Sequence, residues 1–192
     1  MSGSARERLL EAASDLFYHE GIAATGIDRV IARAGVAKAS LYNNFAGKDE
    51  LVAAYLAAAL VRVDERLEAL GRAAPGRATL AFFEDLAVLT ARPGFVGCPF
   101  LNAAVELAPD APARRVVAAF AEHLAIFFAH DLGAGRELGE RLLLCYWGAM
   151  AALRVSPGTD AVREAARLAG VLVDEAAAGS GVPPRTPAAP VR

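Results

Sequence analysis

The sequence has few cysteines, with only Cys98 and Cys145 among its 192 residues. Two cysteines so far apart do not form the disulfide framework of a small secreted domain. The sequence also lacks an excess of positive charge, because its formal net charge at pH 7 is −2. A protein that coats nucleic acid through bulk charge would be strongly basic. These two features argue against a disulfide-rich secreted domain and against a general nucleic-acid coat protein.

Long apolar runs and leader sequences are also missing. No apolar run reaches the length of a membrane span, and no basic leader precedes an apolar segment with a cleavage site. We therefore expect a cytoplasmic protein without a membrane partner.

Catalytic and metal-binding motifs are absent as well. The sequence has no glycine-rich phosphate loop after a strand, no paired zinc-ligand spacing and no nucleophile elbow. We therefore expect no enzymatic activity, no catalytic residue, no cofactor and no metal. His123 and His130 are seven residues apart, so a metal site on one helix face is an alternative. Such histidines are more often ordinary core or surface residues.

What the chain does contain is an abundance of helix-forming residues. It is 55% hydrophobic and 22% charged, and much of its apolar content is Ala and Leu. Runs of β-branched residues with a period of two are absent, so we predict an all-α fold. Glycines and prolines divide the sequence into predicted helices over 5–19, 27–34, 38–45, 48–70, 78–92, 99–107, 113–131, 136–155 and 160–177. A tail rich in Pro, Gly and Ala is predicted to be disordered from Gly179 onward.

Residues 25–51 are the most informative segment of the chain. Thr25 and Asp28 resemble a capping box at the start of a short helix. Gly35 is a predicted left-handed C-cap at its end. The apolar face of this helix consists of residues at helical spacing, namely Ile27, Val30, Ile31 and Ala34. A second short helix follows the turn and is predicted to bury Leu41 and Phe45.

The free face of the second short helix carries polar and aromatic residues. Lys, Ser and Tyr side chains can donate to phosphates, Asn can read adenine edges, and Ala can approach a thymine methyl. Two helices around a tight turn form a helix-turn-helix, which places its second helix in the DNA major groove. We therefore predict binding to double-stranded operator DNA through Thr25, Arg29, Lys38, Ala39, Ser40, Tyr42, Asn43, Asn44 and Lys48. An ordinary helical hairpin is the alternative.

The same segment resembles the N-terminal domain of the TetR family of bacterial transcriptional regulators. The resemblance covers residues 5–52 and rests on residues that match in register, namely Glu20-Gly21, Thr25, Ala34-Gly35-Val36, Leu41-Tyr42, Phe45, Lys48 and Leu51. Two positions depart from the family pattern. Ala37 stands where the family often has a capping serine, and Ile31 stands where it often has a small alanine. Loss of the serine cap weakens the start of the recognition helix by about 1 kcal/mol.

The resemblance and the helix pattern together predict a helix-turn-helix domain at 1–47 and a helical ligand-binding and dimerisation domain at 48–178, and composition predicts the disordered tail at 179–192. The resemblance implies that the second domain senses a ligand. It also implies an effector pocket in the second domain. Aromatic and apolar residues with a few polar neighbours suit a largely apolar small molecule. The predicted ligand-binding residues are Phe82, Phe83, Leu86, Cys98, Phe100, Leu101, Asn102, His123, Phe127, Tyr146, Trp147 and Met150.

The resemblance further implies that the last two long helices pair with their copies across a two-fold axis as a four-helix bundle. A homodimer also follows from the DNA argument, because one short recognition helix reads too few bases. The predicted interface includes small residues that permit close helix approach, and its members are Leu138, Gly148, Ala149, Ala152, Leu168, Val171 and Leu172.

These features together predict a transcriptional repressor that a small molecule releases from its operator. The helix over 48–70 leaves the DNA-binding domain and is therefore the predicted mechanical link. A thiol-based redox or electrophile sensor is one alternative, because Cys98 lies at a helix start, where backbone donors stabilise a thiolate. A helical enzyme or binding protein with an incidental helical hairpin is the alternative from another class.

Overall fold

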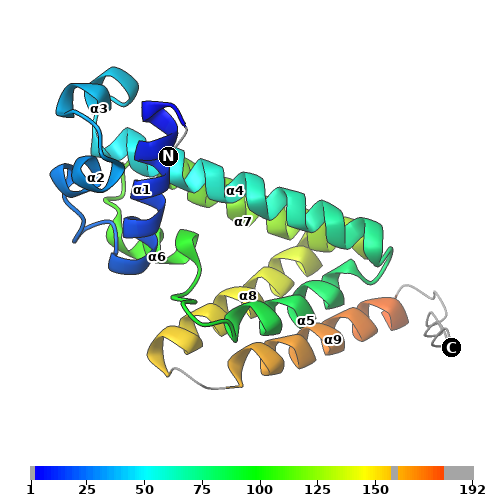
Figure 1. Cartoon of the computed structure of the whole chain (residues 1–192). Helices are drawn as coiled ribbons and strands as arrows, with labels where there is room; N and C mark the ends of the chain where they lie inside the picture. Colours follow the sequence, from blue (N-terminus) through cyan, green and yellow to red (C-terminus); the bar gives the residue numbers. More distant parts are fainter. Residues whose placement is uncertain (1–2, 157–159, 180–192) are drawn as a thin grey trace, which may run out of the picture. The chain divides into compact units, whose positions relative to one another are not determined.

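The helix-forming composition produces an all-α protein, as predicted (Figure 1). The computed structural model describes residues 3–156 and 160–179. Within these ranges the chain forms nine helices and no strand. The helices are α1 (Ala5–Glu20), α2 (Ile27–Ala34), α3 (Lys38–Asn44), α4 (Lys48–Ala73), α5 (Ala78–Thr90), α6 (Pro99–Glu106), α7 (Arg114–Asp131), α8 (Arg136–Val155) and α9 (Ala161–Gly179).

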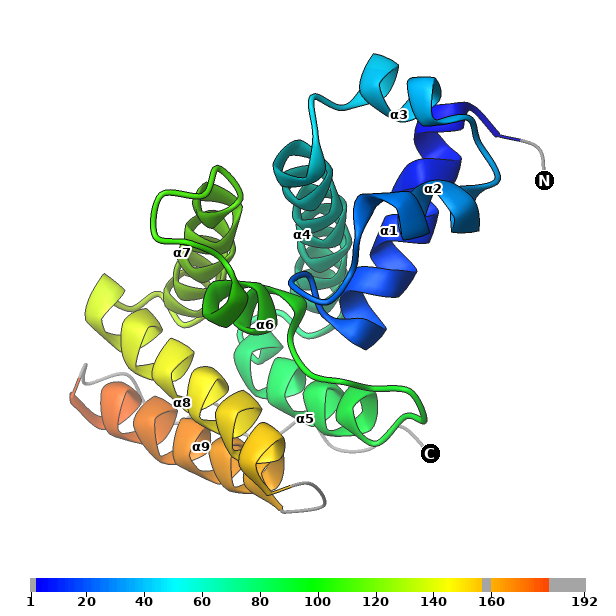
Figure 2. The same ribbon diagram turned by 90° about the vertical axis from the view of Figure 1, so that its left-hand side faces the viewer.

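Helix α1 begins with a reciprocal capping box. The Ser4 hydroxyl accepts a hydrogen bond from the Glu7 N–H at 3.2 Å, and the Ser4 N–H donates to the Glu7 carboxylate at 2.8 Å. The apolar face of α1 repeats with helical spacing and consists of Leu9, Ala12, Ala13, Leu16 and Phe17, all buried. This face packs against α2 and α3, which gives the three-helix arrangement visible in Figure 2.

The turn between α1 and α2 corrects one sequence prediction. The capping box predicted for Thr25 and Asp28 is wrong, because Gly26 is the N-cap of α2 and no side chain caps that helix. Thr25 is fully buried, so its hydroxyl needs a partner inside the protein. It donates to the Gly21 carbonyl at 2.7 Å, one turn back along the chain.

The turn between α2 and α3 confirms the predicted glycine cap. Gly35 has φ 62° and ψ 41°, the left-handed conformation that glycine adopts without a steric penalty. Its N–H donates to the Ala32 carbonyl at 3.2 Å, and the next N–H, from Val36, reaches the Ile31 carbonyl at 3.4 Å. These bonds close α2 and direct the chain into α3.

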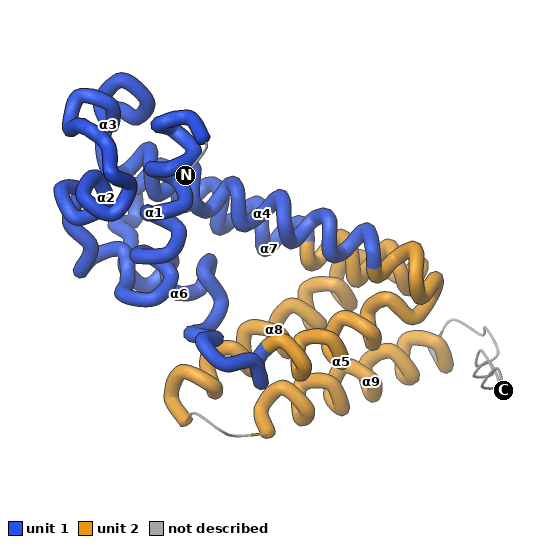
Figure 3. Tube along the Cα trace, viewed as in Figure 1, with its two compact units in different colours: residues 1–69, 90–123 blue, residues 70–89, 124–192 orange. Residues whose placement is uncertain are grey.

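The chain divides into two compact units (Figure 3). Unit 1 comprises residues 1–69 and 90–123, and unit 2 comprises residues 70–89 and 124–192. Helices α4 and α7 therefore begin in unit 1 and end in unit 2. These units do not follow the boundary predicted between residues 47 and 48, because α6 groups with α1, α2 and α3. That domain boundary stays a prediction.

Within unit 1, α6 is fastened to α7 at both ends. Near the start of α6, Phe100 stacks on Phe120 of α7, with ring centroids 4.0 Å apart and ring planes 6° from parallel. At its end, the Arg114 guanidinium donates to three carbonyls near the C-terminus of α6, with distances of 2.7–2.8 Å; they belong to Ala104, Leu107 and Ala108. A cation there also complements the negative end of the helix dipole.

Unit 2 is built around an aromatic core and a pair of adjacent helices. Phe83 of α5 stacks against Phe128 of α7 with centroids 5.8 Å apart. Helix α8 crosses α7 at Gly139, where an added Cβ would run into the Ala125 carbonyl. Helices α8 and α9 run side by side in both ribbon views (Figures 1 and 2).

Helix boundaries differ from the predicted ones at several ends. Helix α4 continues to Ala73 rather than ending at residue 70, since Gly71 is tolerated inside it. Helix α9 continues to Gly179, where the disordered tail was predicted to begin. Residues 180–192 of that tail lie outside the described residues.

Candidate DNA-binding interface and sensor region

Buried anchors fix helix α3 so that its other face is free. Leu41 is fully buried, and Phe45, which follows the helix as its C-cap, is also buried. Ala37 is the N-cap and provides no side-chain hydrogen bond, so the missing serine cap is not replaced by another side chain. The anchors, rather than a cap, therefore hold α3 in place.

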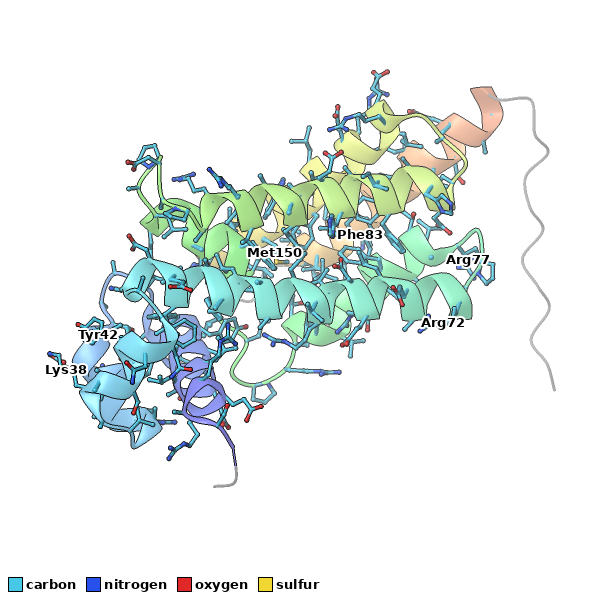
Figure 4. All side chains as sticks on the ribbon, turned by 90° about the horizontal axis from the view of Figure 1, so that it is seen from above. Lys38, Tyr42, Arg72, Arg77, Phe83 and Met150 are labelled. Atoms are coloured by element: carbon cyan, nitrogen blue, oxygen red, sulfur yellow. The ribbon has the colours of Figure 1, made fainter. Side chains whose placement is uncertain are left out.

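The free face of α3 exposes most of the predicted DNA-binding side chains. Tyr42 is 53% exposed, and Ala39 and Asn43 are exposed beside it. Figure 4 shows Lys38 and Tyr42 projecting outward from the DNA-binding helices. An exposed tyrosine between a lysine and an asparagine provides donors for phosphates and for base edges on one short helix.

Three of the predicted DNA-binding residues are less available. Asn44 is half-buried, and its side-chain amide donates to the Ser40 carbonyl at 2.7 Å, so this amide is used within the helix. Ser40 and Lys48 are also half-buried. Asn43 is therefore the better placed of the two asparagines for reading a base.

Thr25 and Arg29 are engaged inside the protein. Because Thr25 is buried and bonded to Gly21, a DNA contact by Thr25 would have to use its backbone amide. Arg29 makes a two-pronged ion pair with Glu20, in which the second contact measures 2.8 Å. Their roles at DNA stay predictions.

Lys38 and Arg33 also face carboxylates. The Lys38 ammonium lies 3.0 Å from Asp28, and the hydrogen bond to Asp28 raises the pKa of Lys38 above its usual value. Arg33 lies 2.6 Å from Asp15 of α1. The cations of α2 and α3 are therefore paired within the protein before any DNA arrives.

Two arginines of α1 support the recognition helix and were not among the predicted site residues. The Arg6 guanidinium lies over the Phe45 ring, 5.0 Å from its centroid. Arg8 donates to the Gly35 carbonyl at 3.4 Å. In the sequence, the one feature of these arginines is their position in the first turns of α1. That position did not predict contacts with Gly35 and Phe45, which lie much further along the chain.

The predicted ligand-binding residues fall into two groups, one in each unit. In unit 2, the Phe82 ring contacts Phe83, Phe127 and Tyr146 with centroid distances of 5.4–6.5 Å, and Trp147 follows 5.1 Å from Tyr146. Leu86 is buried on the same helix. Phe83 and Met150 are fully buried and lie in the interior (Figure 4).

Two further residues of unit 2 belong to this region but were not predicted as ligand-binding. Phe128 lies 5.2 Å from Phe82 between ring centroids and is fully buried. Thr79 is fully buried one turn before Phe82 and Phe83, and its hydroxyl has no hydrogen-bond partner among the residues that the structure describes. A threonine at a helix start is typical of an N-cap, so its burial among apolar residues was not predictable from its position.

The other predicted ligand-binding residues lie in unit 1. Phe100 is buried against Phe120, and the Asn102 amide donates to the Val96 carbonyl at 3.2 Å. Leu101 is half-buried, and its N–H reaches the Cys98 sulfur at 3.5 Å. His123 is exposed and lies 2.9 Å from Asp64. The Asn102 and His123 side chains are thus both engaged in hydrogen bonds within unit 1.

The geometry does not favour a thiol-based sensor. Cys98 is only 3% exposed, so an oxidant or electrophile has little access to it. Burial raises the pKa of the Cys145 thiol, which disfavours the reactive thiolate. Across the described residues, no group of three or more His, Cys, Asp or Glu side chains is arranged to hold a metal ion. Nor is any helix in this part of the chain long and apolar enough to cross a membrane.

The predicted dimer residues differ in their exposure. Gly148, Leu168 and Val171 are exposed on α8 and α9, whereas Ala149 is buried inside unit 2. Leu138, Ala152 and Leu172 are half-buried. Two large apolar residues that were not predicted, Leu144 and Val155, are 68% and 82% exposed on the same side of α8 as Gly148.

A helix-turn-helix with an exposed recognition face, joined to further helices, defines a DNA-binding transcriptional regulator. The family model described as "Bacterial regulatory proteins, tetR family" matches residues 9–55. SCO4454, a TetR-family transcriptional regulator from Streptomyces coelicolor, is 31% identical over 90% of this chain and 95% of that one, with a TM-score of 0.78. The chain belongs to the TetR family, and it is a DNA-binding regulator of transcription.

Further solved structures share this fold. A putative TetR transcriptional regulator from Streptomyces avermitilis (sav143) is 32% identical, over 91% of this chain and 98% of that one, with a TM-score of 0.74. The reduced form of NemR from E. coli is 19% identical and has a TM-score of 0.79, over 88% of this chain and 97% of that one. No curated protein matches the sequence significantly.

Proposed function

We propose that this TetR-family regulator is a homodimeric repressor that a small, largely apolar effector releases from operator DNA. The observation that carries the DNA assignment is the free face of α3. Tyr42 is an aromatic side chain left 53% exposed on a short helix whose opposite face is anchored by Leu41. Burying the Tyr42 ring within the protein would be more favourable than leaving it in water. A partner that covers this side chain therefore explains why it is exposed. The DNA partner would place the protein in the cytoplasm.

The dimer is supported by the exposed apolar side chains of α8 and α9. Leu144 and Val155 on α8, and Leu168 and Val171 on α9, are each more than half exposed within one protomer. A second copy that covers these helices would bury them in a four-helix bundle. A two-fold dimer also presents two recognition helices to half-sites one helical turn apart.

The effector site is proposed at the aromatic cluster of unit 2. Phe82 and Tyr146 are mostly buried, while Phe127 and Trp147 are half-buried and form the accessible edge of the cluster. The unpartnered Thr79 hydroxyl supplies one polar group beside this apolar surface. Mostly apolar surroundings with one or two polar groups suit a small hydrophobic molecule. Phe100, Leu101 and Asn102 on α6 stay secondary candidates.

The signal is proposed to pass through α4 and α6. Helix α4 is continuous from unit 1 into unit 2, and within unit 1 its Tyr55 packs edge-on against Phe17 of α1, with centroids 5.7 Å apart. The segment before α6 is tied to α1, because the Val96 N–H donates to the Tyr18 hydroxyl at 3.2 Å. A shift of either helix would move α3. Half-sites lie about 34 Å apart, so a displacement of a few ångströms loses register.

Fluorescence anisotropy with the full chain tests this function. The probe is duplex DNA from upstream of its own coding region, and the control is a mixed-sequence duplex of equal length. The proposal expects saturable binding to the upstream DNA that exceeds binding to the control by about a thousandfold. Equal binding to both duplexes would contradict a site-specific regulator.

Effector response is tested with a small molecule selected by its stabilisation of the protein against heat. About 3 kcal/mol of coupling would weaken operator binding roughly a hundredfold. Reciprocity requires that operator DNA weaken binding of the same molecule by the same factor. A molecule that binds equally well with and without operator would contradict the proposed release.

A further inference from the structure

The cations of the helix-turn-helix are neutralised within the protein. Arg29 pairs with Glu20, Arg33 pairs with Asp15, and Lys38 pairs with Asp28. A protein that awaits phosphates ordinarily gains affinity from cations that are free to replace counterions. Here each of these side chains must share or leave a carboxylate before it can serve DNA.

The three pairs differ in what they hold together. Glu20 and Asp15 belong to α1, so their pairs with Arg29 and Arg33 fasten α2 to α1. Asp28 instead joins α2 to the first residue of the recognition helix, Lys38. Of the three pairs, this one alone involves a side chain of α3, the helix whose free face is proposed to meet DNA.

The Asp28–Lys38 pair is open to solvent and to DNA. The side chains are 76% and 61% exposed, and the ammonium lies 3.0 Å from one carboxylate oxygen. A carboxylate oxygen at this distance takes one of the three N–H donors that the ammonium would otherwise offer to phosphate oxygens. An exposed pair of this kind is weak, so a well-placed partner can replace Asp28.

We propose that Asp28 is a specificity-determining residue, which holds Lys38 away from phosphates unless the DNA offers a well-placed contact. This inference rests on the proposed role of α3 at DNA. On mixed-sequence DNA, where contacts are loose, the paired Lys38 adds no net charge and releases no counterion. On the operator, where docking fixes the register, Lys38 exchanges Asp28 for a defined base edge or phosphate. Asp28 therefore weakens the complex with mixed-sequence DNA more than the complex with the operator.

The first measurement compares Asp28→Asn with the parent protein on two duplexes of about 30 base pairs, long enough for two half-sites. One duplex is mixed in sequence, and the other is an operator that the parent protein selects from a random library. The charge-matched control is Glu11→Gln, which removes an exposed carboxylate from α1 of the same helix-turn-helix region. Circular dichroism verifies that each variant keeps its helical content.

Asp28→Asn should raise affinity for mixed-sequence DNA on the order of fivefold at low salt and steepen the log–log salt dependence by about 0.9. Operator affinity should change by less, so the ratio of operator to mixed-sequence affinity falls. Glu11→Gln should change both affinities alike and only slightly, because the Glu11 carboxylate is not part of the Asp28–Lys38 pair.

A double-mutant cycle isolates the pair from general charge effects. In the Lys38→Met background, Asp28→Asn should lose most of its effect on mixed-sequence DNA, because no ammonium remains to be released. An equal gain with and without Lys38, or a gain no larger than that of Glu11→Gln, would overturn the inference. Absence of binding by the parent protein to every duplex would instead overturn the proposed function on which it rests.

Discussion

The side-chain carboxylate of Glu106 accepts a hydrogen bond from the backbone amide of Ala23, with 2.6 Å between Oε2 and N. Glu106 is the last residue of α6, where the helix dipole disfavours a negative charge. The bond to Ala23 offsets that local penalty. The same carboxylate lies over Gly21, where an added Cβ would come within 3.2 Å of Oε2 and the backbone has φ +93°. Glu106 therefore fixes the α1–α2 turn to α6.

Replacing Glu106 with alanine should destabilise the protein by about 1 kcal/mol, because the Ala23 amide would lose its charge-assisted partner. Hydrogen exchange at the Ala23 amide should accelerate, since water would replace the carboxylate. Operator affinity should fall as the turn loosens. Chemical denaturation, amide exchange and anisotropy measure these effects. Glu84→Ala removes an exposed carboxylate of α5 and serves as the control. Unchanged exchange at Ala23 would show that the contact is not formed in solution.

Removing Tyr42 and Lys48 together should weaken binding to all DNA sequences alike. Replacement of both by alanine deletes one hydroxyl and one cation, so affinity should fall about tenfold and the salt slope should fall by about 1. Arg77→Ala removes an exposed cation just before α5, away from the proposed DNA and dimer surfaces, and should leave DNA binding unchanged. A folded Tyr42→Ala, Lys48→Ala variant with the parent's operator affinity would contradict the assignment of this surface.

The two thiols should react slowly in the folded protein. Cys98 is buried, and burial raises the pKa of Cys145, so less thiolate is present at a given pH than for a free cysteine. Alkylation with iodoacetamide at pH 8, followed by mass spectrometry, should label neither residue quickly. Labelling should become rapid in denaturant. Fast modification of folded Cys98 with loss of operator binding would restore the thiol-sensor alternative.

Gly139 should tolerate no side chain, because a Cβ there meets the backbone carbonyl of Ala125, which cannot move aside without shifting α7. Gly139→Ala should therefore destabilise the protein by about 1–3 kcal/mol through overpacking. Gly71→Ala is the matched control: its Cβ meets nothing within 4 Å, so the gain in helix propensity should stabilise by up to about 1 kcal/mol. Changes of opposite sign in the free energy of unfolding, measured with denaturant for the two variants, would verify the close crossing of α7 and α8.

The helices were predictable because their signals are local. Pro99 opens α6 with Cys98 as the N-cap, and Gly35 closes α2 in the left-handed conformation. Apolar residues at a 3.6-residue period then identify the buried faces, as in α1. The misplaced capping box at Thr25 shows the limit of such signals. Burial of Thr25 turned its hydroxyl toward Gly21, and burial is set by tertiary packing.

The site was predictable only in part, because its contacts join distant residues. Tyr42 and Asn43 are exposed as the helix-turn-helix pattern requires. No periodicity, however, indicates that Glu106 meets Ala23, 83 positions away. The predicted ligand-binding residues shared composition and spacing, yet Phe83 and Phe100 lie in different units. Sequence spacing identifies which residues share a helix face, and the packing of one helix on another decides which faces meet.

The dimer prediction is best tested at Gly148. Arginine at Ala149 would be a poor test, because Ala149 is buried in the protomer and the variant would unfold rather than dissociate. Gly148 is exposed, and an added Cβ there meets nothing within 4 Å, so Gly148→Arg fits the protomer. In the proposed four-helix bundle the same arginine would hold two helices apart and bring two like charges together across the two-fold axis.

Analytical ultracentrifugation at micromolar concentration should therefore find the parent as a dimer and Gly148→Arg as a monomer with unchanged helical content. Gly71→Arg places the same change on an open part of α4 and should remain dimeric. Operator affinity should fall steeply for Gly148→Arg alone, because a monomer engages one half-site and loses the effective concentration that the second recognition helix supplies. A dimeric Gly148→Arg variant that binds operator like the parent would place the interface elsewhere on the molecule.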